Sequence, residues 1–367
     1  MTKKVFVLAG EASGDLLGAE AMQAIKHQTN GDVQFRGVGG KQMQAEGLES
    51  LYPMTDLSVM GLFEVLRRLP TLIKRMLQTE KAIRSWQPDL ILTIDAPDFS
   101  FRLAKRVRDT GIKHVHYVAP TVWAWRPGRA KKIAKLIDHL LAVLPFEPPY
   151  FEKEGLPCTY VGHPVSRLGI DTIDRQQFRI QHNIAAETKL LCMLPGSREG
   201  EVTRLLPVFQ ETVKRLRQDD PDLKVVVPLA DTVADKVKSL INMDVIYTNG
   251  EQEKYAAMRA SDAALAASGT VSLQLAMAEI PFVIGYKMNP ITAWLAKKVV
   301  KVPSMTLVNL LLDKPVVPEF FQNDCTSVRL CQALQDCFSP SKRTAFLKDL
   351  KEVKQKIESS NNFLYLS

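Results

Sequence analysis

The residues that decide the fold class are VFVLAGEASGD at positions 5–15, close to the start of the chain. Val5 to Ala9 form a continuous apolar run that is typical of a buried parallel strand. Two glycines and several polar residues follow this run, and a segment with helical periodicity, Leu16 to Lys26, comes next. A strand, a tight turn and a helix in this order make up a βα unit, so the sequence predicts an α/β fold on parallel strands.

The same pattern recurs along both halves of the chain. In the first half, strands are expected at Leu90 to Ile94, Val115 to Val118 and Leu140 to Leu144, and helices at Phe101 to Arg108 and Arg129 to Leu136. In the second half, strands are expected at Leu190 to Leu194, Lys224 to Val227, Ala263 to Ala266 and Phe282 to Gly285, with helices after Ser197, Gly250, Gly269 and Asn289. A chain of 367 residues with this pattern predicts two doubly wound, Rossmann-like domains that face a central cleft.

The predicted hinge lies at Val161 to Asp174, which combines glycine, proline and polar residues. We therefore expect an N-terminal domain over residues 1–165 and a C-terminal domain over residues 166–340. Residues 341–367 are expected to form a helical tail, and a return of this tail to the N-terminal domain is one expectation.

Composition excludes several classes of protein. No stretch reaches the roughly 20 apolar residues that cross a bilayer, and the five cysteines form no CxxC pair. The formal charge of +8 and the pI near 9.1 suit a polyanionic partner. Zinc-finger spacing and aromatic RNA-binding motifs are absent from the sequence. These features predict a cytoplasmic protein that does not bind nucleic acid.

The turn after the first strand reads Gly10-Glu11-Ala12-Ser13-Gly14-Asp15, which is not GxGxxG, so a two-domain dehydrogenase loses its main support. Two interpretations of the turn remain open. Ser13 or Asp15 is the N-cap of the following helix, or Glu11, Ser13 and Asp15 bind sugar hydroxyl or ammonium groups on the acceptor side of a site.

Asp95 directly follows the apolar strand Leu90 to Ile94, at the carboxyl end that faces the cleft in this architecture. Partial desolvation there raises a carboxyl pKa and makes the group a better proton acceptor. Asp95 is therefore the candidate catalytic base. Asp98 follows Pro97 and precedes a helix, which favours an N-cap.

His114 and His116 share one face of an expected strand, and Trp123 and Trp125 follow in a loop. A metal site needs at least one further ligand nearby, so the pattern favours a packed strand and an aromatic loop. We predict no metal and no cofactor.

Two strand-to-helix corners of the second half are candidate diphosphate sites. Ser197 and Arg198 open one helix, and Ser268, Gly269 and Thr270 open another. Helix N-terminal amides and a guanidinium stabilise phosphate charge, and small residues let amides approach it closely. The second domain is therefore the expected nucleotide-sugar binder, and the first domain the expected acceptor binder.

The segment from Asp56 to Leu77 is both apolar and basic, and Ile291 to Val302 has the same character. One interpretation is buried core with a solvated cationic edge. The other is a surface that contacts an anionic membrane. Its candidate contacts are Met60, Leu62, Phe63, Val65, Leu66, Arg67 and Arg68.

Along nearly its whole length the chain resembles the lipid-A-disaccharide synthase family. The motifs that carry the resemblance are AGEASGD, GVGGKQMQAEG, SVMGLFEVL, IDAPDFS, HYVAPTVWAWRPGR, LPFE, VGHPV, LPGSREGEV, ASGT, GYKMNP and VNLL. The resemblance implies an inverting transferase of the GT-B type. Its partners would be UDP-2,3-diacylglucosamine, 2,3-diacylglucosamine 1-phosphate and the cytoplasmic face of the inner membrane, and a homo-oligomer is left open.

Carried over by residue, the resemblance implies that Asp95 takes the proton of the acceptor hydroxyl. Arg198 and the Ser268-Gly269-Thr270 corner would hold the UDP diphosphate, and Asn309 would line the donor site. Gln274 stands where the family usually has a glutamate, so a ribose contact would pass to a neutral amide. Two alternatives remain: a related UDP-sugar transferase or epimerase of the same fold, and a catalytically weakened UDP-sugar-binding protein.

Overall fold

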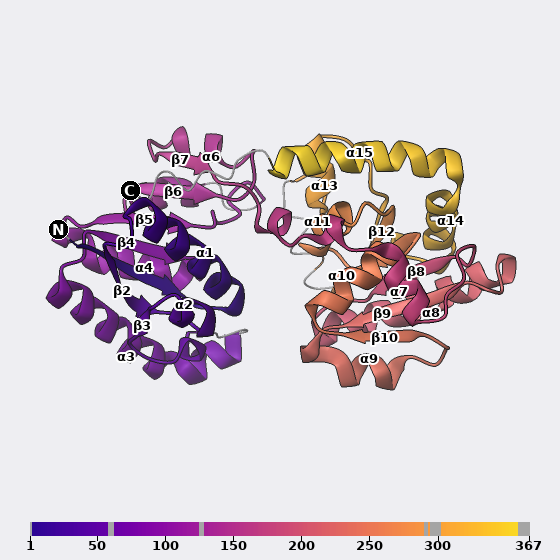
Figure 1. Cartoon of the computed structure of the whole chain (residues 1–367), viewed down its shortest axis with the longest axis horizontal. Helices are drawn as coiled ribbons and strands as arrows, with labels where there is room; N and C mark the ends of the chain where they lie inside the picture. The colour runs from indigo at the N-terminus through magenta and orange to yellow at the C-terminus, as the bar shows by residue number, and fades with distance from the viewer. Residues whose placement is uncertain (1, 58–61, 125–127, 290–292, 294–301, 359–367) are drawn as a thin grey trace. The chain divides into compact units, whose positions relative to one another are not determined.

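The computed structural model describes residues 2–57, 62–124, 128–289, 293 and 302–358, and in the helix that begins at residue 62 it describes side chains from residue 68 onward. Within these residues the chain divides into two compact units, shown in Figure 1. Unit 1 ends at Pro164, and unit 2 spans Val165–Glu358. Each unit is built on its own parallel sheet.

The sheet of unit 1 has seven strands in the order β3-β2-β1-β4-β5-β6-β7. The strands are β1 (Lys3–Ala9), β2 (Val33–Val38), β3 (Glu49–Ser50), β4 (Leu90–Ile94), β5 (Lys113–Tyr117), β6 (His139–Ala142) and β7 (Cys158–Tyr160). All pairs are parallel. Strand order reverses between β1 and β4, and ligands of doubly wound sheets bind at such switch points.

Helices connect these strands, as Figure 1 shows. They are α1 (Ala12–Gln28), α2 (Lys41–Ala45), α3 (Leu62–Trp86), α4 (Pro97–Val107), α5 (Arg129–Ile133) and α6 (Pro148–Glu152), with 3-10 turns η1 (Met54–Asp56) and η2 (Arg108–Thr110). Side chains of α3 and α4 pack with Phe6, Leu8 and Ile91 of the sheet in one apolar cluster. This packing fixes α3 and α4 beside the switch point.

The sheet of unit 2 has six parallel strands in the order β10-β9-β8-β11-β12-β13. The strands are β8 (Leu190–Leu194), β9 (Lys224–Leu229), β10 (Ile246–Asn249), β11 (Ala263–Ala266), β12 (Phe282–Tyr286) and β13 (Glu319–Phe321). The switch point lies between β8 and β11, where Leu194 and Ala266 are register partners. The residues that follow these two strands are therefore neighbours.

Unit 2 carries the remaining helices of the described chain. They are α7 (Arg175–Gln181), α8 (Glu199–Asp219), α9 (Ala234–Leu240), α10 (Glu251–Ala260), α11 (Val271–Met277), α13 (Leu307–Leu312), α14 (Ser327–Phe338) and α15 (Pro340–Glu358), with 3-10 turns η3 (Pro164–Arg167), η4 (Ile170–Thr172), η5 (Asp231–Val233) and η6 (Gln322–Asp324). Helix α15 packs on α11, α13 and α14 and buries Leu350, Val353 and Ile357. Residues 359–367, the end of the expected tail, lie outside the described residues, so its return to the N-terminal domain stays a prediction.

The α/β class and the two parallel sheets confirm the predicted fold class. The predicted helix after Asn289 lies largely outside the described residues. Two capping predictions were wrong: the N-cap position of α1 is Glu11, and that of α4 is Ala96. Asp98 lies instead in the first turn of α4 and forms an ion pair with Arg129 at 3.3 Å.

All five cysteines of the chain are buried and free, and burial raises the pKa of each thiol. For Cys337 the pKa rises to about 12. These thiols are therefore inert side chains of the core. In the part of the chain that the structure describes, no helix has the length and apolar character to cross a bilayer.

Candidate functional site

Asp95 and Ala96 connect β4 to α4 in a left-handed backbone conformation that residues other than glycine rarely adopt. Their φ angles are 51° and 44°. The Asp95 amide donates to the Tyr117 carbonyl at 2.9 Å, and the Ser100 hydroxyl donates to the Asp95 carbonyl at 2.9 Å. These bonds hold a strained corner, and such strain is concentrated at functional sites.

The corner after β1 meets the corner after β4. A Cβ atom placed on Gly10 would lie 2.8 Å from the Ala96 Cβ, so glycine permits the contact. Glu11 follows Gly10 at the start of α1 and is partly buried. The predicted residues Glu11 and Asp95 are thus brought to one place, the switch point of the sheet.

Both carboxyl groups have a raised pKa. Burial raises the pKa of Asp95, and a backbone hydrogen bond from Ala96 opposes this. Burial also raises the pKa of Glu11, and the nearby charge of Asp95 raises it further. A carboxylate whose pKa lies above its ordinary range accepts a proton more readily, which suits a general base.

Asp15 and Ser13 have different surroundings. The buried Asp15 carboxylate accepts hydrogen bonds from the amides of Gly40, Gln42 and Met43, at 2.7, 3.0 and 3.1 Å. These amides lie at the start of α2, so Asp15 caps that helix. Its contact with the acceptor stays a prediction. Ser13 is exposed on the first turn of α1 and stays a candidate.

A groove of about 670 Å³ lies beside the Asp95 corner in unit 1. Its lining includes Glu11 and Ala96. Helix α3 contributes apolar side chains, namely Leu69, Leu72, Ile73, Met76 and Leu77. Helix α4 contributes Pro97, Asp98, Phe99, Arg102, Lys105 and Arg106. The groove therefore combines an apolar side with a cationic side.

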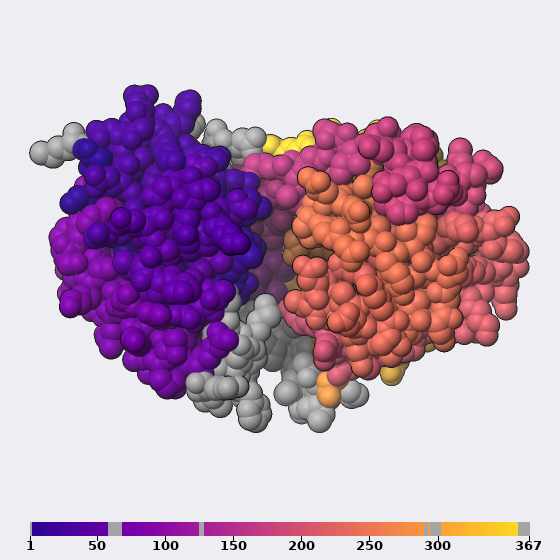
Figure 2. Space-filling model, turned by 60° about the horizontal axis from the view of Figure 1, so that its bottom comes forward, coloured from indigo at the N-terminus to yellow at the C-terminus, as the bar shows by residue number. Residues whose placement is uncertain are grey.

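Part of the apolar side also faces solvent. Leu69, Ile73 and Leu77 are 39%, 54% and 50% exposed, and their i, i+4, i+8 spacing places them along one stripe of α3. Helix α3 lies on the lower side of unit 1 in Figure 1, and Figure 2 turns that side toward the viewer.

Most of the predicted membrane contacts lie outside the part of the chain whose side chains are described. Met60, and the side chains of Leu62, Phe63, Val65, Leu66 and Arg67, lie outside the described residues, as do Ile291 and Trp294 of the second segment. Arg68 is described: it is exposed and its guanidinium donates to the Thr55 carbonyl at 3.2 Å. The membrane surface stays a prediction.

In unit 2, the two predicted diphosphate corners lie side by side because β8 and β11 are adjacent. At the first corner Gly196 has φ 115°, and a Cβ atom there would lie 2.9 Å from the Glu201 Cβ. Arg198 is the N-cap residue of α8, and its 69% exposed side chain pairs with Glu201 at 3.1 Å. Ser197 is exposed, and its carbonyl accepts a hydrogen bond from Thr232.

The second corner contains Ser268, Gly269 and Thr270. Gly269 has φ 133°, and Thr270 is the N-cap residue of α11. The Ser268 hydroxyl donates to the Met305 carbonyl at 3.3 Å. Gln274 lies one turn further along α11 and is partly buried. Two adjacent strand-to-helix corners of this kind suit an anion, so diphosphate binding at this edge stays a prediction.

Asn309 is held by the backbone of unit 2. Its amide donates to the Val317 carbonyl at 3.0 Å and its oxygen accepts from the Val317 amide at 2.8 Å. The side chain also borders a cavity of about 380 Å³ that includes Ser304 and Glu319. Asn309 therefore supports this cavity by closing a loop, a role that its place in the sequence does not reveal.

Glu319 was missed by the sequence analysis. Its carboxylate accepts from the Ser304 hydroxyl at 2.7 Å, the Met305 amide at 3.1 Å and the Thr306 amide at 2.6 Å. Because Met305 in turn accepts from Ser268, Glu319 positions the loop that borders the second corner. The one available signal was its place at the start of a short strand.

Glu147 was also missed, although the motif LPFE contains it. The carboxyl group is almost fully buried, accepts from the Trp123 indole N–H at 3.1 Å and from the Leu144 amide at 3.0 Å. Burial raises the pKa of Glu147 to about 7. The group ties the aromatic loop after β5 to the loop after β6. Trp125 lies outside the described residues.

His114 and His116 are buried, as predicted for a packed strand. Both rings contact the Thr93 hydroxyl, at 3.0 and 2.8 Å. Burial lowers the pKa of His114 to about 4 and of His116 to about 3, so both are neutral. The described residues contain no group of three or more His, Cys, Asp or Glu side chains placed to hold a metal ion.

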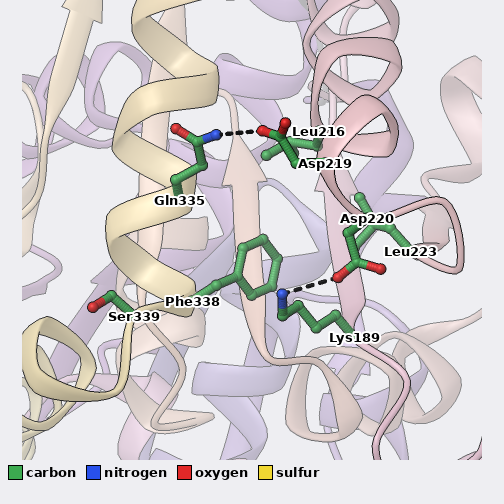
Figure 3. Close-up of a pocket in the computed structure, with 8 residues that line it drawn as sticks. All are labelled: Lys189, Leu216, Asp219, Asp220, Leu223, Gln335, Phe338 and Ser339. Carbon is green, nitrogen blue, oxygen red and sulfur yellow. Dashed lines mark hydrogen bonds and ion pairs between the residues drawn. The ribbon is translucent and has the colours of Figure 1, made fainter.

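A smaller pocket of about 220 Å³ lies in unit 2, next to the start of β8 and therefore at the opposite edge of its sheet. Figure 3 shows two pairs among its polar side chains: Gln335 donates to Asp219, and Lys189 pairs with Asp220. Because these groups satisfy each other, the pocket is not a candidate for the reaction.

Comparison with known proteins places the chain among close relatives. A family model described as lipid-A-disaccharide synthetase matches residues 5–364. The chain is 51% identical to the lipid-A-disaccharide synthase of Rhodospirillum centenum, over 95% of this chain and 88% of that protein. It is 46% identical to the enzyme of the same name from Paramagnetospirillum magneticum, over 90% and 86%.

Solved structures of low sequence identity share the fold. UDP-GlcNAc 2-epimerase from Neisseria meningitidis, bound to UDP-GlcNAc, has a TM-score of 0.63 at 12% identity and covers 95% of this chain and 94% of its own. MurG from Acinetobacter baumannii has a TM-score of 0.56 at 12% identity and covers 97% and 99%. At this identity the likeness concerns the fold alone.

Proposed function

The chain belongs to the lipid-A-disaccharide synthetase family, and from that premise we propose that it transfers 2,3-diacylglucosamine from UDP-2,3-diacylglucosamine to 2,3-diacylglucosamine 1-phosphate. The products are the β-1,6-linked disaccharide 1-phosphate and UDP. The observation that carries the proposal is the Asp95 corner, where a partly buried carboxylate lies beside an amphipathic groove.

On the acceptor side, Asp95 takes the proton of the 6-hydroxyl. The freed oxygen attacks the anomeric carbon of the donor as the bond from that carbon to the diphosphate breaks, which inverts the anomeric configuration. The raised pKa of Asp95 supports this role because it matches the carboxylate better to a weakly acidic hydroxyl. The apolar side chains of α3 give an acyl chain a place to lie.

On the donor side, the diphosphate binds at the two adjacent corners of unit 2. Amides at the start of α8, the exposed Arg198 and the Ser268-Gly269-Thr270 turn stabilise the charge that develops as UDP leaves. Gln274 and the cavity beside Asn309 serve the rest of the donor. The enzyme needs no metal ion for this step, since the guanidinium and the amides supply the countercharge.

The substrates are acylated, so the enzyme works at a membrane surface, which we assign to the cytoplasmic face of the inner membrane. The exposed stripe Leu69, Ile73 and Leu77 supports this assignment, together with the exposed Arg68. Apolar side chains insert and cations contact anionic lipid, which gives peripheral and reversible binding.

The alternatives left open by the sequence receive less support. Eight relatives at 40–51% identity all bear the name lipid-A-disaccharide synthase. The epimerases and MurG are 12–13% identical. A weakened UDP-sugar binder rests on Gln274 and on the altered sequence of the tail, while Asp95 and Arg198 are both present.

Incubation of the purified protein with both substrates tests the proposal. We expect a disaccharide phosphate by mass spectrometry and an equal amount of UDP. UDP-GlcNAc supplied alone should be recovered with its configuration unchanged, which separates transfer from 2-epimerisation. Absence of the disaccharide from folded protein that binds UDP would exclude the transferase assignment.

A further inference from the structure

Helix α4 presents three cationic side chains to the groove of unit 1. Arg102, Lys105 and Arg106 are separated by three and four residues, which places them on one face of the helix. Arg106 is already paired, because it donates to the Glu80 carboxylate at 2.6 Å. Among the described residues, Arg102 and Lys105 have no ion-pair partner, and both are exposed.

The opposite side of the groove is apolar. Leu72 and Met76 of α3 are turned toward the unit's core cluster, and Ile73 and Leu77 extend the apolar surface outward. A ligand that satisfies both sides carries a hydrocarbon chain and an anionic group on the same small molecule. A free nucleotide matches only the cationic side, and an unmodified sugar matches neither side.

The position of the cations relative to Asp95 limits where the anionic group lies. Helix α4 begins at Pro97, two residues after Asp95, and each residue advances the helix by about 1.5 Å, so Arg102 starts roughly 7–8 Å along the axis and Lys105 roughly 12 Å. The distance along α4 from its start to Arg102 is thus about the width of a sugar ring. An acylated sugar whose hydroxyl lies at Asp95 can therefore place an anionic group on the far side of its ring near Arg102.

We propose that Arg102 and Lys105 bind the phosphate group of the acylated sugar acceptor and thereby select a phosphorylated acceptor over an unphosphorylated one. The inference rests on the proposed function, since it names the part of the acceptor that α4 recognises. Arg102 supplies a planar pair of donors and Lys105 a compact charge. Arg106 is paired with Glu80, so the proposal assigns it no direct contact with the phosphate.

The experiment compares two acceptors that differ only in the phosphate. Short-chain 2,3-diacylglucosamine 1-phosphate and its dephosphorylated form are assayed without membranes, using wild type and Arg102→Ala/Lys105→Ala. We expect kcat/KM of the variant to fall about 10- to 100-fold for the phosphorylated acceptor, mainly through KM, which is the range for lost hydrogen bonds to charged groups. The dephosphorylated acceptor should show little change, so the preference of wild type collapses.

Two further variants serve as controls. Lys3→Ala/Lys113→Ala removes two exposed lysines from the amino-terminal ends of β1 and β5 and should retain the full preference for the phosphate. Arg102→Lys/Lys105→Arg keeps both charges and should retain most of the preference for the phosphorylated acceptor. Equal losses on both acceptors, or a preference unchanged in the double alanine variant, would overturn the inference.

Two arms separate other sources of the effect. If the alanine variant lost binding to phosphatidylglycerol vesicles, relative to phosphatidylcholine vesicles, and kept its acceptor preference, the cations would serve lipid headgroups, and the inference would be wrong. Equilibrium binding of the phosphorylated acceptor, followed by ³¹P NMR, does not depend on turnover. The wild-type protein could bind the phosphorylated acceptor and yet form no disaccharide. If the alanine variant then lost that phosphate-dependent binding, the inference would be supported and the proposed function would fail.

Discussion

At the scale of single residues, the chemistry of unit 1 depends on how the backbone presents Asp95. Two consecutive residues with positive φ cost about 1–3 kcal/mol each. The Tyr117 carbonyl and the Ser100 hydroxyl hold this corner through hydrogen bonds. This strained backbone places the Asp95 carboxylate at the switch point of the sheet, close to Glu11 and at the start of α4.

Replacing Asp95 with asparagine should lower kcat by about a hundredfold or more, since general-base catalysis contributes 10²–10⁴. UDP binding should be nearly unchanged because the donor corners lie in unit 2. In wild type, the rate should decline as pH falls through the raised pKa of Asp95, since the base must be ionised. Wild-type turnover in folded Asp95→Asn protein would refute the assignment.

Replacing Arg198 with alanine should weaken UDP binding or leaving-group stabilisation by about 1.5–3 kcal/mol, the range for hydrogen bonds to charged groups. Arg198 is exposed and pairs only with Glu201 among the described residues, so the fold should not depend on it. Isothermal titration with UDP and steady-state kinetics measure the two effects. If both match wild type, the corner before α8 is architectural.

At the scale of elements, the strands with continuous apolar sequence were predictable. Leu90–Ile94, Leu190–Leu194 and Ala263–Ala266 begin and end where the sequence indicated, because each is buried on both faces. Strand β2 was missed, since Gln34 and Arg36 interrupt its apolar pattern. Pairing with β1 compensates for that interruption, and no local pattern reveals a partner about thirty residues away.

The candidate site follows the same rule. The positions of Asp95, Arg198 and Gly269 were predictable because each lies at a local corner between a strand and a helix. The roles assigned to them stay predictions. The capping of α2 by Asp15 was not predictable, because its amide partners lie 25 to 28 residues along the chain. Glu319 and Glu147 were missed for the same reason: each carboxylate holds a loop that the sequence does not place beside it.

The link between α1 and α2 through Asp15 should be visible in stability. Asp15→Ala removes the acceptor for three amides and should lower the free energy of unfolding by about 2–4 kcal/mol. Asp15→Asn keeps one acceptor oxygen and should lose less. Urea denaturation measures both, with Asp32→Ala, at an exposed aspartate of the same unit, as a control expected within about 0.5 kcal/mol of wild type. If Asp15→Ala were as stable as wild type but had a raised KM for the acceptor, Asp15 would contact the acceptor and would not be needed for stability.

The connection held by Glu147 should make stability depend on pH. Burial raises the pKa of Glu147 from 4.5 to about 7, so the folded chain retains the proton over a range in which the unfolded chain loses it. The contribution of the Glu147 carboxyl to the free energy of unfolding is therefore complete below pH 4.5 and is lost as pH rises toward 7. The difference amounts to about 2–4 kcal/mol, at 1.36 kcal/mol per pKa unit.

Glu147→Gln provides the matched measurement, because a neutral amide can still accept from the Trp123 indole. The pH dependence of its free energy of unfolding should be flatter than that of wild type between pH 4.5 and 7. Parallel profiles for the two proteins would show that Glu147 ionises in the folded chain as it does in water.

At the scale of the whole molecule, the proposed function assigns a different task to each unit. Unit 1 carries the proposed base, the groove and the exposed stripe of α3, and unit 2 carries the predicted phosphate corners. Because each unit has its own sheet and core, a change on the surface of one should leave ligand binding by the other intact.

Membrane association tests this division. Ile73→Glu/Leu77→Glu places charges on the exposed stripe of α3 and should lower binding to anionic vesicles about tenfold or more, since inserted apolar area and nearby cations both contribute. UDP affinity should be unchanged. Ile180→Glu/Val328→Glu, at exposed apolar positions of unit 2, is the matched control in a vesicle sedimentation assay. Equal vesicle binding by wild type and the α3 variant would place the membrane surface elsewhere.

The burial of all five cysteines makes the native chain a ready background for fluorescence. Thiols with raised pKa react slowly with maleimides at neutral pH, because the thiolate is the reactive species. A cysteine introduced on the surface of each unit would therefore take up dye selectively, with no native thiol to remove first. Energy transfer between two such dyes would follow the separation of the two units through a catalytic cycle, one molecule at a time.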